Sequence, residues 1–171
     1  MNLIDTILIG IISGVIASFC YSVAMMLIRP KIKISDEIAQ KDKICYIKIV
    51  NRTVATVTNL QYSLHYCEYH HDGSISIIEI PPRKEPLKIM KKNRFWKKVD
   101  TDNAIQITYE LDQSIYALDR KEKKLMFDVI GSHVFSGTTT FATKTYTGND
   151  VVQAVFESGN STKTISISSG L

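Results

Sequence analysis

The chain has few of the residues that mark enzymes and secreted proteins. Its 171 residues include only 3 cysteines, 1 tryptophan and 4 prolines. This is too little cysteine for the dense disulfide framework of a small secreted domain, and it favours reduced thiols. A glycine-rich phosphate loop, a serine or cysteine nucleophile motif and a catalytic carboxylate pair are all lacking. We therefore expect neither an enzyme nor a cofactor.

A metal site is not expected either. Four potential ligands lie close together in the sequence: His65, Cys67, His70 and His71. Alternate residues of a strand share a face, so His65 and Cys67 are expected on the same side. The group nevertheless lacks the paired Cys-x-x-Cys spacing of structural zinc, and the rest of the chain offers no second half.

Charge is absent from residues 6–28, TILIGIISGVIASFCYSVAMMLI, and the run ends at Arg29-Pro30-Lys31. A helix that crosses the hydrocarbon core needs about 20 apolar residues, each rising ~1.5 Å. We expect one transmembrane helix within residues 1–30 and one domain over residues 31–171. A cleaved signal sequence is the alternative, but such signals open with basic residues, whereas this segment opens with Asp5.

Positive charge follows the apolar run and does not precede it; the cations are Arg29, Lys31, Lys33, Lys41 and Lys43. The positive-inside rule therefore predicts a single-pass protein of the cell inner membrane, with its N-terminus outside and its C-terminal domain in the cytoplasm. Arg29, Lys31 and Lys33 are expected to meet lipid headgroups where the helix leaves the bilayer. Glycosylation sequons at Asn51 and Asn160 would matter only on the exported side.

Small residues recur every fourth position of the apolar run. The predicted pore or helix-packing face consists of Gly10, Ser13, Gly14, Ala17, Ser18, Tyr21 and Ser22. Such stripes let membrane helices approach closely, and they would place hydroxyl groups near a bundle axis, where polar groups meet partners or water. The alternative is that these residues are simply common in membrane helices.

Strand patterns dominate the remainder of the chain. Alternating or β-branched runs predict strands at residues 44–50, 59–69, 75–80, 104–111, 124–130, 138–146 and 151–156. Turn residues separate them, notably His71-Asp72-Gly73, Gly131 and Ser136-Gly137. Seven or eight short strands predict a mainly β fold, an antiparallel immunoglobulin-like β-sandwich that follows one N-terminal transmembrane α-helix.

Residues 83–98 contain eight cations and one carboxylate, a net charge of +7. Clustered cations attract phosphates, and aromatic rings can stack on bases. The run therefore predicts a site for an anionic ligand, a nucleotide or oligonucleotide but not duplex nucleic acid, at Arg83, Lys84, Lys88, Lys91, Lys92, Arg94, Trp96, Lys97 and Lys98. A solvated loop without a ligand is the alternative.

Several segments, taken together and in order, resemble a known family. They are Arg29-Pro30-Lys31, residues 47–52, 109–112, 114–118 and 127–131, Ser136-Gly137, and residues 144–146 and 151–156. Their order and spacing resemble the inner helix and cytoplasmic domain of inward-rectifier potassium channels. The resemblance implies a homotetramer whose helices line a pore, whose β-sandwich domains gate it, and whose Arg29 and Lys31 contact phosphoinositides.

The chain departs from that family at its start. Only Met1 to Asp5 precede the helix, so we expect neither an outer helix nor a Thr-x-Gly-Tyr-Gly filter, and hence poor ion selectivity. A pore of this kind must be tightly gated, which suits a toxic effector of bacterial antiviral defence controlled by a nucleotide or oligonucleotide. One rival hypothesis is a non-conducting membrane-anchored adaptor that recruits a cytoplasmic partner. Another is an extracellular carbohydrate-binding or adhesion domain with a Cys45–Cys67 disulfide.

Overall fold

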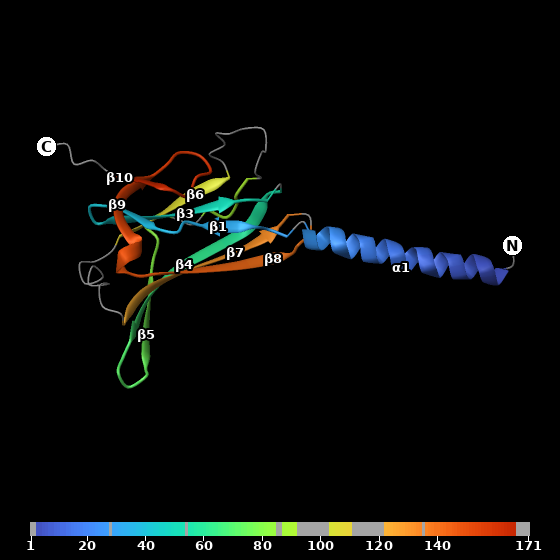
Figure 1. Cartoon of the computed structure of the whole chain (residues 1–171), viewed down its shortest axis with the longest axis horizontal. Helices are drawn as coiled ribbons and strands as arrows, with labels where there is room; N and C mark the ends of the chain where they lie inside the picture. The colour runs from blue at the N-terminus through green and yellow to red at the C-terminus, as the bar shows by residue number, and fades with distance from the viewer. Residues whose placement is uncertain are drawn as a thin grey trace.

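The computed structural model describes residues 3–27, 29–53, 55–84, 87–91, 103–110, 122–134 and 136–166. Helix α1 (Leu3–Leu27) precedes a mainly β region and extends away from it as a single rod (Figure 1). The strands are β1 (Ile32–Ile34), β2 (Ile38–Lys41), β3 (Ile44–Asn51), β4 (Val57–Tyr69), β5 (Ile75–Ile80), β6 (Ala104–Glu110), β7 (Lys123–His133), β8 (Thr139–Tyr146), β9 (Val151–Phe156) and β10 (Thr164–Ser166). A 3-10 turn, η2 (Gly148–Asp150), precedes β9.

Two sheets pack face to face, which confirms the predicted immunoglobulin-like β-sandwich after one N-terminal helix. One sheet has the order β5-β4-β7-β8. In the other, β6 pairs along the whole of one edge of β3, while β1 and β2 share the opposite edge. β1 and β2 therefore act as one strand interrupted at residues 35–37, and β9 and β10 continue the sheet beyond β2.

One strand pair runs against the prediction of a purely antiparallel sandwich. β2 and β9 are parallel, with Ile38 opposite Val151 and Gln40 opposite Gln153. A parallel pair needs a long crossover connection, and here the chain passes through both sheets between the two strands. Local sequence patterns carry no information about such distant neighbours.

The core lies between the sheets. β3 directs Cys45, Ile47 and Ile49 inward, and the facing sheet contributes its own alternate residues, Leu64, Tyr66, Leu125, Phe127 and Val129. Tyr109 meets the ring of Phe127 edge to face, with 6.4 Å between ring centroids. The buried phenol of Tyr146 donates a hydrogen bond of 2.8 Å to the carbonyl of Ser35, which closes the break between β1 and β2.

Gly131 lies within a strand, although the sequence pattern predicts a turn there. The prediction of a turn there is wrong, because β7 continues through Gly131 to His133. A Cβ at this position would lie only 2.5 Å from Cγ1 of Val57. Glycine is thus needed for the close approach of two strands, not for a turn.

Candidate functional site

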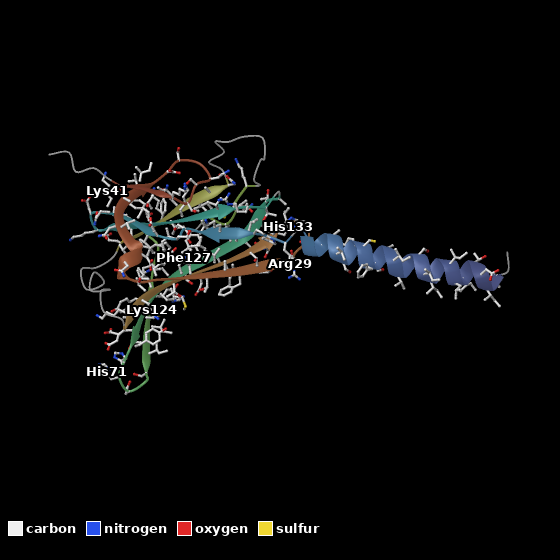
Figure 2. All side chains as sticks on the ribbon, viewed as in Figure 1. Arg29, Lys41, His71, Lys124, Phe127 and His133 are labelled. Atoms are coloured by element: carbon white, nitrogen blue, oxygen red, sulfur yellow. The ribbon has the colours of Figure 1, made fainter. Side chains whose placement is uncertain are left out.

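The side chains of residues 3–24 of α1 are not covered by the part of the chain that the structure describes. Residues 3–24 are all exposed, and the stretch that is long and apolar enough to span a membrane, Leu3–Met25, is not buried (Figure 2). A Cβ built on Gly10 or Gly14 would meet nothing within 4 Å. The predicted small-residue stripe therefore lies on an open face of the helix.

Two hydroxyl groups of that stripe bond within the helix itself. Ser13 donates to the carbonyl of Gly10 at 3.0 Å, and Ser22 donates to the carbonyl of Ser18 at 2.9 Å. Polar groups satisfied in this way can lie in hydrocarbon without an unpaired donor. Ser13 and Ser22 therefore do not need the external partners that the sequence led us to expect.

The chain shortly after the helix is tied to the sandwich. The backbone N–H of Lys31 donates to the hydroxyl of Thr53 at 2.6 Å, and the N–H of Arg52 donates to the carbonyl of Lys31 at 2.7 Å. β1 then starts at Ile32 and pairs with the end of β3. The chain thus passes from helix to sheet through a short, hydrogen-bonded junction.

Asn51 organises this junction, a role that the sequence does not reveal. Its side chain is fully buried; the amide nitrogen donates to the carbonyls of Ala55 at 2.8 Å and Lys91 at 3.0 Å. The amide oxygen accepts from the N–H of Thr53 at 2.8 Å. Asn103 donates to the backbone carbonyl of Asn51 at 3.1 Å. A glycan on Asn51 is incompatible with this buried network.

The three cations predicted to meet lipid headgroups are exposed at the same junction. Arg29 lies where α1 meets the sandwich (Figure 2). Neither Arg29 nor Lys31 has a carboxylate partner among the residues the structure describes. Lys33 pairs with Asp36 at 3.6 Å, and Lys144 pairs with the same carboxylate at 3.0 Å. The hydrogen bond from Lys144 lowers the pKa of Asp36.

The predicted basic segment is described only in part. Arg83, Lys84, Lys88 and Lys91 are exposed, whereas Lys92, Arg94, Trp96, Lys97 and Lys98 lie outside the described residues. Backbone bonds hold the described part against the sandwich: the N–H of Arg83 donates to Thr108, and the N–H of Leu60 donates to Lys88. These bonds place Arg83 beside β6 and Lys88 beside β4.

Two small hollows flank Tyr62 next to this segment. One, of about 350 Å³, is lined by residues 59–62 and Lys88; the other, of about 190 Å³, includes Lys84 and Leu87. Burial raises the pKa of Tyr62. The sequence pattern predicts Tyr62 only as a strand residue. In the structure it lines both hollows, one together with Lys88 and the other together with Lys84.

β9 and β10 form an antiparallel hairpin, the C-terminal hairpin, and a buried lysine holds it against the outer face of β3. The Lys48 side chain is 2% exposed, and Nζ donates to the carbonyl of Glu157 at 2.6 Å. The ammonium also lies 5.9 Å from the centroid of the Phe156 ring. Burial lowers the pKa of Lys48. The alternation of β3 predicts an outward lysine but not the hairpin that covers it.

Ser63, His65 and Asp128 meet on the outer face of the other sheet. Nε2 of His65 lies 2.9 Å from Oγ of Ser63 and 3.9 Å from Oδ2 of Asp128. A serine–histidine–aspartate relay needs the serine and the carboxylate on opposite ring nitrogens. Here one nitrogen faces both groups, so the cluster is not arranged as a relay. No group of three or more potential metal ligands is assembled within the described ranges.

Cys45 and Cys67 are both free thiols. Cys45 lies in the core, and burial raises its pKa to about 12. Burial and the nearby Asp128 carboxylate also raise the pKa of Cys67. The disulfide expected of an extracellular adhesion domain is therefore not formed.

Comparison with known proteins identifies a distant structural neighbour. No family model matches the chain, and no curated protein matches it. A similar solved structure is the GAE domain of GGA2p from Saccharomyces cerevisiae, at 19% sequence identity and a TM-score of 0.39. The match covers 68% of this chain and 88% of that one. At this level the likeness carries no functional inference.

Proposed function

We propose that the protein is an oligomeric single-pass membrane protein that forms a gated, poorly selective ion channel controlled by its β-sandwich domain. The observation that carries the proposal is the uncovered apolar surface of α1. Such a surface is stable only in lipid or against other apolar helices. The cationic flank favours the inner membrane with the sandwich in the cytoplasm.

Conduction requires several copies, because one helix encloses no lumen. The open faces at Gly10 and Gly14 would let neighbouring helices approach closely. The resemblance to inward-rectifier channels supports a tetramer. A poorly selective pore would depolarise the cell, which suits a toxic effector of bacterial antiviral defence.

The bonded junction supports control of the helix by the sandwich. Lys31 is held by Thr53 and Arg52, so a shift of the β3 end would move Lys31, which lies four residues after the last residue of α1. A ligand would open or close the pore by binding one of two conformations more tightly. Lys84 and Lys88 beside Tyr62 support a nucleotide or oligonucleotide as that ligand.

Ion flux from liposomes that contain the full-length protein tests the proposal. Gly14→Leu should abolish flux, because the added side chain fills the face where helices approach. A Cβ at Gly14 meets nothing within 4 Å in the described part of one chain, so a loss of flux would point to contacts between chains. Ile16→Phe is the matched control, since it adds volume about 200° around the helix. Flux that survives Gly14→Leu unchanged would contradict the proposed packing.

A non-conducting adaptor is the second candidate, and the β4–β5 hairpin favours it. This hairpin projects from the sandwich, and Ile75, Ile77 and Ile78 are 51, 60 and 59% exposed (Figure 1). Apolar side chains on a projecting edge strand suit a protein partner. An adaptor predicts a tight bilayer under every ligand condition, whereas the channel predicts flux that depends on Gly14.

A further inference from the structure

A polar groove of about 470 Å³ lies beside the junction between helix and sheet. Its walls come from β1, the chain after β3, and the segment leading into β10. Three cations line it, Lys33, Arg52 and Lys163, and three hydroxyl groups accompany them, those of Ser161, Thr162 and Thr164. Of these residues, only Lys33 is predicted from the sequence to meet an anionic group.

The two carboxylates in the groove are already engaged. Asp36 accepts from Lys144 at 3.0 Å and pairs with Lys33 at 3.6 Å. Glu37 accepts a hydrogen bond from the hydroxyl of Thr164. By contrast, neither Arg52 nor Lys163 has a carboxylate partner within the described part of the chain; Arg52 makes a long bond of 3.4 Å to the carbonyl of Asn160. Cationic donors therefore remain available in the groove.

We propose that this groove binds the phosphate group of a phosphomonoester. A guanidinium can donate two parallel bonds to phosphate oxygens, and ammonium and hydroxyl groups donate to the remaining ones. The groove is larger than one phosphate, so it accommodates part of the attached alcohol. The same chemistry occurs in a lipid headgroup and in a soluble phosphate ester.

The groove has a rigid wall and a direct link to the helix. Lys48 holds the C-terminal hairpin through the carbonyl of Glu157, so the wall that carries Lys163 is fixed to β3. The N–H of Arg52 donates to Lys31, the second residue after Arg29. A phosphate held by Arg52 would therefore stabilise one position of the backbone at Lys31, four residues after the end of α1. Only this link to gating rests on the proposed channel; the binding itself does not.

Titration of the full-length protein in phosphatidylcholine nanodiscs tests the proposal. Inorganic phosphate is the soluble probe, and calorimetry measures its binding. Phosphatidic acid added to the discs is the lipid probe, followed by its retention over phosphatidylcholine in native mass spectrometry. Binding of inorganic phosphate assigns the groove to soluble esters, and selective retention of phosphatidic acid alone assigns it to headgroups. Both results support a phosphate site.

Charge-neutralising variants locate the site. Arg52→Gln and Lys163→Gln should each weaken binding of whichever probe binds the wild type by about tenfold, because each removes a cationic donor. Both side chains are exposed, so the variants should melt like the wild type. Lys41→Gln, an exposed cation outside the groove, should bind normally. The proposal is overturned if neither probe binds, or if correctly folded Arg52→Gln binds as well as the wild type. Binding without ion flux would keep the groove and reject the channel.

Discussion

α1 and the core of the β-sandwich differ in the exposure of their apolar side chains. Phe127 in the sandwich is completely buried, whereas Phe19 in the helix is 69% exposed. The sandwich buries a core of hydrophobic residues between its two sheets, although the β4–β5 hairpin leaves Ile75, Ile77 and Ile78 exposed. The helix must find its apolar partners outside the chain. Fold stability should therefore depend on the sandwich, and assembly on the helix.

The two regions meet at a junction that is polar rather than apolar. Buried Asn51 and the hydroxyl of Thr53 hold the backbone there through hydrogen bonds. Polar networks of this kind favour one arrangement because a partly broken network leaves buried groups unpaired. At this junction, hydrogen bonds hold the backbone of the two regions in place.

The largest contrast in stability should come from the two phenylalanines. Phe127→Ala removes a buried ring that contacts Tyr62 and Tyr109, and should lower the free energy of unfolding by about 3–5 kcal/mol. Phe19→Ala should leave that free energy unchanged. Denaturant unfolding of both full-length variants in detergent measures the difference. Equal losses would mean that the helix packs on the sandwich after all.

A smaller loss is expected at the junction. Asn51→Ala leaves the Thr53 N–H and the carbonyls of Ala55 and Lys91 without this partner, and should cost about 1–3 kcal/mol. Asn149→Ala, which alters an exposed amide in η2, is the matched control and should cost far less. The same unfolding experiment applies. A neutral Asn51→Ala would show that the network does not hold the junction.

The smallest effect should be a pH dependence at Asp36. Its pKa is lowered in the folded state, so its pairing with Lys144 stabilises the fold above the ordinary value of 3.8 and is lost as the pH falls through the folded pKa. Because this carboxylate is exposed, Asp36→Asn should cost less than about 1 kcal/mol at neutral pH. The cost should vanish in acid. A cost that persists there would assign Asp36 another role. Glu110→Gln, at an exposed carboxylate in β6, serves as the control.

Much of the sandwich could be predicted from local pattern. All seven predicted strands are present. Where the strand ends lie within the described residues, they differ from the predicted ends by at most three positions. The pattern does not predict β1, β2 or β10, which have only three or four residues each. Segments this short form because neighbouring strands pair with them, and that information is not local.

The candidate site was less predictable than the fold. Exposed cations such as Arg29 and Lys84 are evident from charge alone, but Arg52 and Lys163 are 111 residues apart and meet only through the fold of the C-terminal hairpin. Asn51 resembles an ordinary polar residue at the end of a strand until its buried partners are known. Tyr62 gains significance only from the lysines beside it.

The most direct measurement is the mass of the full-length protein in lipid nanodiscs, because a single helix cannot surround an ion path. The account predicts an assembly of several chains, four by its resemblance to inward-rectifier channels, and predicts that Gly14→Leu dissociates it while Ile16→Phe does not. A protein that remains monomeric in lipid at every ligand condition would contradict the central claim.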